Sequence, residues 1–558
     1  MRRWKQWRPA LLAVAFALAI AISNCSSPAT NQTSNSSSSP TNTPAATPTA
    51  APPGALVYGL GREPVNLESG NITDSNSIMV HEQIYDRLIA FKPGATELEP
   101  GLATKWSSSE DGKVWTFKLR PGVKFHDGTD LDAEAVRFNI ERWWNAKSEY
   151  GYRDAGKTYE GWGDLFGGYK GTPKSLLQDV VAEGKDTVRF VLKQPFTVFP
   201  SALASGYLGI SSPTAIKKAQ ARYGTPSSTA VGTGPFIFKE WRTGDSIVLT
   251  KKPNYWKQGF PKSEQLVFRF ITDPAARLAQ LRSGTLDITV QLAPDQLKEL
   301  QKDPNLAAVP RPSLNVGYLA LNPSYEPFKK VEVRQAIAYA INKNEIIKAF
   351  WGDTAESSPH FIPPTFKEFQ SQNVTNYNYD PQKAKQLLAQ AGYPNGFNLQ
   401  LWYLPVSRPY YPTPKPIAEA FAADLSAVGI KVSLQTKDFA AYLADRNKPP
   451  GYQAYMYGWS ADYGDPENFY YPHFGPGATA DLGNWKNDQV LKLLDQGRAV
   501  SDKTERIKIY QQVDEILNKE VVRLPIVHSR PLSAKRKSVQ GWTPSPLDGE
   551  PLNSVTKS

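Results

Sequence analysis

The sequence predicts an α/β protein whose folded part is divided into at least two lobes. Segments with the alternating, β-branched pattern of strands are interspersed along the chain with segments of helical periodicity. The 504 residues that follow position 54 are more than one hydrophobic core normally serves. A content of 40% hydrophobic and 11% aromatic residues is typical of a globular body. No fixed repeat of the solenoid kind is found in the sequence.

Strands and helices are predicted from these periodicities along the whole folded part. The predicted strands are 55–60, 114–119, 187–192, 246–250 and 264–270. The predicted helices are 133–144, 273–283, 330–340, 381–391, 416–428, 488–499 and 503–519. Asp380 and Asn342 each precede a helical pattern and supply a side chain that can cap its first turn.

The N-terminus has the pattern of an export signal. Arg2, Arg3, Lys5 and Arg8 precede an apolar run at 10–22 that is too short to span a bilayer, and no later stretch of 18 apolar residues follows. We therefore expect residues 1–24 to be a signal peptide and the mature chain to act outside the cytoplasm.

Cys25 is the only cysteine, so an internal disulfide is excluded. It stands where a bacterial lipoprotein carries the thiol that is lipidated after cleavage, although Asn24 occupies a position that usually holds glycine or alanine. The alternative is an incidental cysteine in an ordinary signal peptide. Residues 26–54 are almost all Ser, Thr, Pro, Asn and Ala, a composition that predicts a disordered linker. Such a linker would let the folded part reach roughly 30 Å from a lipid anchor.

The charge of the chain argues against nucleic-acid binding. Loss of the four basic signal residues lowers the formal net charge from +11 to +7. The remaining basic residues are dispersed, with one short cluster at 535–537, and a solvated basic face is the simpler interpretation.

Signatures of catalysis and of metal binding are missing from the sequence. His81 and Glu82 begin a metalloprotease-like pattern, but Tyr85 stands where its second histidine belongs. No pair of histidines has helical i, i+4 spacing, and no Gly-x-Ser-x-Gly motif occurs. We therefore predict that the protein is not an enzyme and has no catalytic residue, protein-bound metal or cofactor.

Two segments carry the residues most suited to binding a ligand. Segment 455–469 places Asp462 near Trp459 in a turn-rich setting, and segment 404–412 places Arg408 beside two tyrosines. A carboxylate and a guanidinium flanked by aromatic rings suit both ends of a small zwitterion such as a peptide. The alternatives are a turn-stabilising role for Asp462, a structural ion pair for Arg408, and core packing for the aromatic residues.

Several further motifs resemble those of the family 5 solute-binding proteins of ABC importers, and most closely those of dipeptide-binding proteins. The resemblance extends from about residue 55 to about residue 551. The motifs that carry it are PGLATKWSSSEDGKVWTFKLRPGVKFHDGT at 100–129, VGTGPFIFKEW at 231–241, KKPNYW at 251–256, LNVGYLALN at 314–322 and VRQAIAYAINKNEII at 333–347.

This resemblance implies the type II periplasmic-binding-protein fold, in which two lobes are joined by crossing strands and the ligand occupies the cleft between them. The crossings are expected near 314–321 and 522–528. The implied boundaries are lobe I at 55–312 plus 527–558, an extra subdomain of lobe I at about 88–230, and lobe II at 313–526.

The resemblance also assigns roles to individual residues. Asp462 matches the aspartate that takes the ligand's α-ammonium group, and Arg408 matches the arginine that pairs with its C-terminal carboxylate. Since two extended residues span roughly 7 Å, fixing both ends would select for peptide length. Trp459, Tyr410 and Tyr411 are expected to line the pocket.

The expected function is that of a lipid-anchored receptor that captures dipeptides or short peptides and delivers them to an ABC permease and ATPase complex. A monomer is expected. Within the same class, the cargo could be a longer oligopeptide, a nickel chelate, haem or a sugar-like solute. From a different class, the chain could be a peptide-sensing or chaperone-like receptor.

Overall fold

The computed structural model of the chain describes residues 54–558. The predicted signal peptide, Cys25 and nearly all of the predicted linker therefore lie outside the described residues. Within residues 54–558, no helix has both the length and the apolar character that crossing a bilayer requires.

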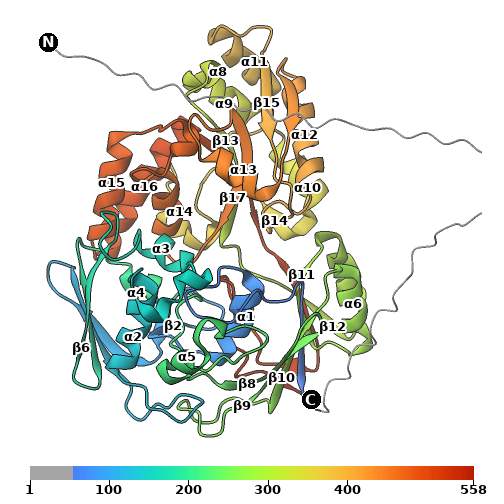
Figure 1. Cartoon of the computed structure of the whole chain (residues 1–558). Coiled ribbons are helices and arrows are strands. Elements are labelled where there is room, and N and C mark those ends of the chain that lie inside the picture. Colours follow the sequence, from blue (N-terminus) through green and yellow to red (C-terminus); the bar gives the residue numbers. More distant parts are fainter. Residues whose placement is uncertain (1–53) are drawn as a thin grey trace, which may run out of the picture. The chain divides into compact units, whose positions relative to one another are not determined.

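A seven-stranded sheet with the order β12-β19-β11-β1-β10-β9-β8 forms the first of two large structural units, which we call lobe I (Figure 1). Its strands are β1 (Leu56–Leu60), β8 (Phe236–Arg242), β9 (Ser246–Lys251), β10 (Gln265–Phe270), β11 (Ile288–Leu292), β12 (Leu306–Pro310) and β19 (Leu532–Arg536). The strand β1 pairs in parallel with β10 and β11, whereas the other pairs are antiparallel. Lobe I also contains α1 (Ser75–Ile84), α6 (Pro274–Ser283) and α7 (Leu297–Lys302).

An antiparallel four-stranded sheet, β4-β5-β7-β6, forms a subdomain inserted into lobe I between β1 and β8. Its strands are β4 (Ala103–Ser108), β5 (Val114–Leu119), β6 (Leu177–Glu183) and β7 (Thr187–Leu192). The accompanying helices are α2 (Ala133–Trp144), α3 (Glu160–Phe166), α4 (Phe199–Leu203) and α5 (Pro213–Ala219). Aromatic rings fill its core, with Phe117, Phe190 and Phe199 packed at centroid distances of 5.2 to 6.4 Å.

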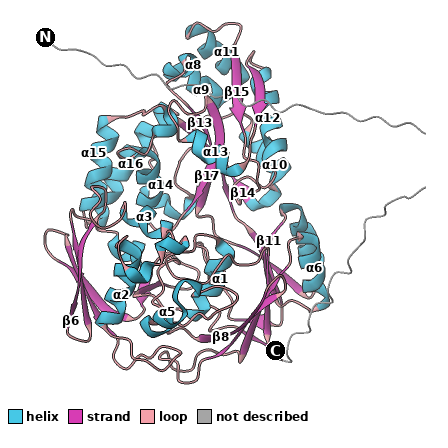
Figure 2. Ribbon diagram, viewed as in Figure 1, coloured by secondary structure: helices cyan, strands magenta, loops and turns pink. Residues whose placement is uncertain are grey.

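Lobe II is built on a six-stranded sheet with the order β14-β18-β13-β17-β15-β16 (Figure 2). Its strands are β13 (Asn315–Leu321), β14 (Ala355–Glu356), β15 (Asn398–Trp402), β16 (Lys431–Gln435), β17 (Ala454–Ser460) and β18 (Arg523–Ser529). Its helices are α8 (Glu326–Lys329), α9 (Val331–Ala340), α10 (Lys343–Phe350), α11 (Pro381–Gln390), α12 (Pro414–Ser426), α13 (Phe439–Arg446), α14 (Glu467–Phe474), α15 (Asp488–Ala499) and α16 (Lys503–Glu520). Two-stranded pairs β2 (Ile89–Phe91) with β3 (Leu98–Pro100), and β20 (Val539–Gln540) with β21 (Thr556–Lys557), complete the strands of the described residues.

The chain crosses from one large sheet to the other twice. It leaves the seven-stranded sheet after β12 and enters the six-stranded sheet at β13, and it returns between β18 and β19. The strands β13 and β18 lie side by side and antiparallel at the centre of lobe II. The two connections therefore emerge at the same edge of the lobe II sheet.

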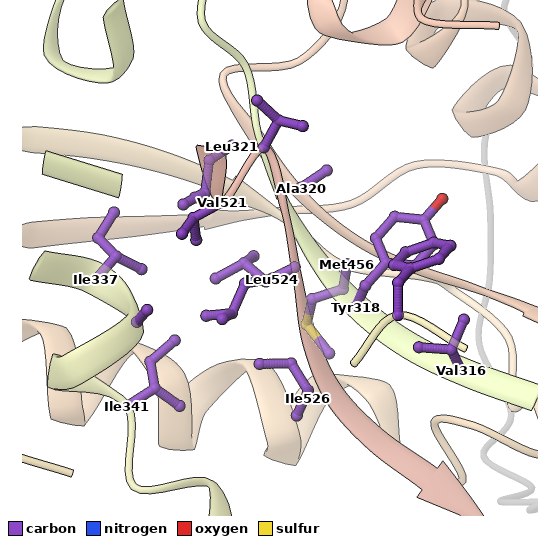
Figure 3. Close-up of a cluster of buried hydrophobic side chains, with 14 of the residues drawn as sticks. Val316, Tyr318, Ala320, Leu321, Ile337, Ile341, Met456, Val521, Leu524 and Ile526 are labelled. Atoms are coloured by element: carbon purple, nitrogen blue, oxygen red, sulfur yellow. The ribbon is translucent and has the colours of Figure 1, made fainter. Parts of the chain in front are cut away.

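The core of lobe II lies on both faces of these central strands. On one face Ile337 and Ile341, from and just after α9, point toward Leu524 and Ile526 of β18 (Figure 3). On the other face Tyr318 packs edge-on against the ring of His473 in α14, at 5.6 Å. The sheet is thus covered on both sides, as an α/β fold requires.

The predicted secondary structure is confirmed in most places. Helices α2 and α15 have the predicted bounds, and Asp380 and Asn342 cap their helices through their side chains. Helix α12 begins at Pro414, two residues earlier than predicted, because proline is well suited to the first helical position.

Candidate functional site

Two adjacent loops of lobe II carry the predicted anchor residues Arg408 and Asp462. Strands β15 and β17 pair in parallel, and Arg408 follows β15 whereas Asp462 follows β17. Because the carboxyl ends of parallel neighbours meet at one edge of a sheet, both loops emerge at that edge. This edge is also where the chain crosses to lobe I, since β13 begins there and β18 ends there.

The loop that carries Arg408 is held against the sheet by Tyr410. Gly317 and Gly458 face each other across β13 and β17, and a Cβ atom on Gly458 would lie 2.4 Å from Cδ2 of Tyr410. The Tyr410 ring can occupy this position only because residue 458 is a glycine. Tyr410 is only 6% exposed. Tyr411 is fully buried, with its ring centroid 6.2 Å from that of Trp351. Both tyrosines are predicted to line the pocket; the structure places them in the hydrophobic core of lobe II, and pocket lining by either one stays a prediction.

Arg408 itself has an available guanidinium group. Its backbone forms a tight turn with Tyr411 through two N–H···O bonds of 3.0 Å, and Ser529 Oγ donates to the Pro409 carbonyl at 2.8 Å. The guanidinium lies 4.6 Å from the centroid of the Phe439 ring. Within residues 54–558 no carboxylate forms an ion pair with Arg408, so the structure does not support a structural ion pair as its role.

Of the three carboxylates at 462–467, Asp462 is the one that lacks a cationic partner among the described residues. Asp465 forms a bidentate pair with Arg506 at 3.0 and 2.8 Å, and Glu467 pairs with Arg498 at 3.1 Å. These two ion pairs fix the start of α14. Asp462 therefore remains free to bind a cation.

Asp462 is oriented by Asn468 of α14 and by Tyr207 of lobe I. Asn468 Oδ1 accepts from the Asp462 backbone N–H at 2.8 Å and from Trp459 Nε1 at 3.2 Å, and its Nδ2 donates to Asp462 Oδ2 at 3.3 Å. The Tyr207 hydroxyl donates to Asp462 Oδ1 at 2.5 Å. Sequence reasoning missed Asn468 and Tyr207. Asn468 could have been suspected because it lies six residues from Asp462 in the sequence. No feature of the sequence indicated that Tyr207 contacts Asp462.

The environment of Asp462 disfavours its negative charge. The pKa of Asp462 is raised to about 6, chiefly by burial and to a smaller extent by Asp164 and Asp548, against the opposing effect of the hydrogen bonds from Tyr207 and Asn468. A bound cation stabilises a buried carboxylate more strongly than it stabilises an exposed carboxylate. The arrangement can therefore hold an ammonium group.

Other parts of the described chain offer weaker sites. A hollow of about 610 Å³ lies between α2 and α5, but three of its four acidic residues, Asp130, Glu134 and Glu141, are paired with Lys124, Arg137 and Lys170, and the fourth, Asp132, caps α2. Residues 54–558 contain no cluster of three or more His, Cys, Asp or Glu side chains that could hold a metal ion.

Known proteins of one family resemble this chain over most of its length. Residues 97–481 match the family model described as "Bacterial extracellular solute-binding proteins, family 5 Middle". The chain is 35% identical to the dipeptide-binding protein of Escherichia coli over 89% of its own length and 92% of that protein, and 34% identical to heme-binding protein A of Haemophilus influenzae over 89% and 90%. The solved structure of HbpA2 from Haemophilus parasuis, 30% identical, superposes with a TM-score of 0.80 over 90% of this chain and all of that one.

These matches establish the type II periplasmic-binding-protein fold, and proteins of this kind bind a solute for an ABC transporter without transforming it. The chain therefore belongs to family 5 of the bacterial extracellular solute-binding proteins.

Proposed function

We propose that the protein is an importer receptor that binds dipeptides or other very short peptides by their two charged ends. Asp462 takes the α-ammonium group and Arg408 takes the C-terminal carboxylate, while Trp459 lines the pocket between them. The observation that supports this most directly is that two charged groups, which have no ionic partner among residues 54–558, lie on adjacent loops at one sheet edge.

The chemistry of the two groups fits these roles. A guanidinium offers a planar fork of donors to a carboxylate, and an ionised aspartate offers only acceptors to an ammonium with three donors. Hydrogen bonds to charged groups contribute about 1.5 to 3 kcal/mol each. A dissociation constant of about 1 μM, which corresponds to about −8 kcal/mol, is expected for such a ligand.

Tyr410 and Tyr411 support the Arg408 loop from the core in this proposal. The ligand is enclosed as the lobes close, and an ABC permease then recognises the closed form. Export, lipidation at Cys25 and action as a monomer remain part of the proposal.

The cargo can be tested by native mass spectrometry of protein purified without refolding. A trapped mass within the dipeptide to tripeptide range, and calorimetric binding of a free dipeptide near micromolar affinity, are expected. A trapped mass of haem, or of a longer oligopeptide, would contradict the proposal.

The raised pKa of Asp462 predicts that peptide binding weakens below about pH 6. A bound ammonium stabilises the ionised carboxylate, so the pKa of Asp462 is lower in the peptide complex than in the free protein. In acid, peptide binding therefore releases a proton from Asp462. We expect affinity at pH 5 to be about tenfold lower than at pH 7.5, since a shift of one pKa unit corresponds to a tenfold change.

Calorimetry in two buffers of different ionisation enthalpy should detect this proton release near pH 5. The variant Asp462→Asn is the control, because it cannot titrate and should bind equally at both pH values. An unchanged affinity of the wild type between pH 7.5 and pH 5 would show that Asp462 does not hold the ammonium group.

A further inference from the structure

In the described part of the chain, one side-chain hydrogen bond joins Asp462 of lobe II to lobe I. Tyr207, in the segment between α4 and α5, donates its hydroxyl to Asp462 Oδ1 at 2.5 Å across 255 residues of sequence. The predicted amine site thus receives one side chain from each lobe.

Tyr207 is held firmly in position by its own lobe. Its carbonyl oxygen accepts from the Gly70 backbone N–H at 2.7 Å. Its ring lies over Gly161 of α3, where a Cβ atom would come within 3.1 Å of the ring. Two residues before Gly70, the buried carboxylate of Glu68 is paired with Arg142 and Lys157. The hydroxyl of Tyr207 is therefore presented from a rigid support.

Further contacts join the lobes beside this hydrogen bond. The Thr197 backbone N–H donates to the Arg498 carbonyl at 2.9 Å, and the Arg498 guanidinium lies 4.5 Å from the centroid of the Phe196 ring. The side chain of Tyr463, next to Asp462, is packed within the aromatic core of the lobe I subdomain. The Tyr207 contact therefore belongs to a surface along which the two lobes meet.

We propose that Tyr207 is the lobe I half of the amine site, which holds the Asp462 carboxylate only when the lobes are closed and so couples ammonium binding to closure. This inference rests on the proposed function. The Tyr207 hydroxyl occupies one acceptor position, on Oδ1 of Asp462. The ligand's ammonium takes the remaining acceptor positions of the same carboxylate. Lobe opening would remove the Tyr207 contact.

The groups that face this carboxylate are consistent with that role. Asp164 from α3 and Asp548 from the C-terminal segment both act on Asp462 and on Tyr207, and Asn468 from α14 donates to Oδ2. Burial and these carboxylates raise the pKa of Tyr207 well above its ordinary value, so its hydroxyl remains a donor at all relevant pH values. An arriving ammonium would meet acidic groups from both lobes.

The variant Tyr207→Phe tests this inference because it removes one hydroxyl and keeps the ring. We expect it to bind alanyl-alanine about 5- to 20-fold more weakly than the wild type. In the wild type the hydrogen bond from Tyr207 lowers the pKa of Asp462. Its removal should raise that pKa, so the loss of affinity in acid should begin at a higher pH. In an Asp462→Asn background, where the hydroxyl can bond only a neutral amide, Tyr207→Phe should have a much smaller effect.

Small-angle scattering of the ligand-free protein gives a readout that does not depend on the cargo. Tyr207→Phe should increase the radius of gyration as the open form gains population. Tyr325→Phe is the matched control, because its hydroxyl bonds the Gly451 carbonyl at 2.9 Å within lobe II, and it should change neither measurement.

The outcomes separate the two proposals. If the wild type binds no dipeptide, the proposed cargo is wrong, and the scattering comparison still decides whether Tyr207 supports closure. If the wild type binds and Tyr207→Phe matches it in affinity, pH profile and scattering, the role of Tyr207 is overturned. An equal loss in the wild-type and Asp462→Asn backgrounds would also overturn it, because the two residues would then act independently.

Discussion

Replacing Asp462 by asparagine should weaken binding of a free-amine dipeptide by about 10- to 150-fold, as expected for loss of a hydrogen-bonded charge worth about 1.5 to 3 kcal/mol. The amide keeps the shape of the side chain and one acceptor oxygen but loses its charge. The hydrogen bonds from Tyr207 and Asn468 can persist in weaker form. Calorimetry with the dipeptide and with its N-acetylated analogue measures the effect, and the analogue should lose much less affinity.

The matching variant Arg408→Gln provides the reciprocal control. Its loss of affinity should be large for a peptide with a free C-terminal carboxylate and small for the C-terminal amide, and this loss should be the same for free and acetylated N-termini. Because Arg408 has no ionic partner among the described residues, its loss should leave the free energy of unfolding nearly unchanged. If Asp462→Asn lost equal affinity for free and acetylated peptides, Asp462 would not be the residue that binds the ammonium group.

The elements with strong periodicity could be predicted from the sequence because local pattern and tertiary packing agree there. In β5 and β7, alternate residues are buried, and each strand has the predicted bounds. The N-caps Asp380 and Asn342 were also predictable, because a capping side chain acts within three residues of its own position. Such local signals do not depend on the register of a sheet.

The candidate site could be predicted only in part, since its supporting contacts join distant segments. Asp462 and Arg408 stood out by residue type and family resemblance, but the burial of Tyr410 depends on the pairing of Gly317 with Gly458. Sequence alone does not fix that register. The contact between Tyr207 and Asp462 spans both lobes, and no periodic pattern carries information of that kind.

The buried ion pair between Arg523 and Asp481 supports the strand on which the site is built. The Arg523 side chain is 1% exposed, and its two terminal nitrogens donate to Asp481 at 3.0 and 3.1 Å. One of these nitrogens also donates to the Tyr455 hydroxyl in β17 at 2.6 Å. Burial alone would raise the pKa of Asp481, yet Arg523 holds it below its ordinary value. The carboxylate is therefore charged in the core and depends on this partner.

Replacing Arg523 by methionine should lower the free energy of unfolding by about 3 to 5 kcal/mol, because it leaves the Asp481 charge buried without its partner. Denaturant unfolding measures the loss. Adding Asp481→Leu should restore most of the stability, since a buried pair replaced as a whole by apolar residues is often nearly neutral.

Arg242→Met is the surface control: its pair with Glu240 is 42% exposed on both sides and should contribute less than about 1 kcal/mol. If Arg523→Met cost no more than Arg242→Met, the buried pair would not stabilise lobe II. A stability loss that persisted in the double variant would instead point to the contact with Tyr455, which connects Arg523 directly to the strand that ends beside Asp462.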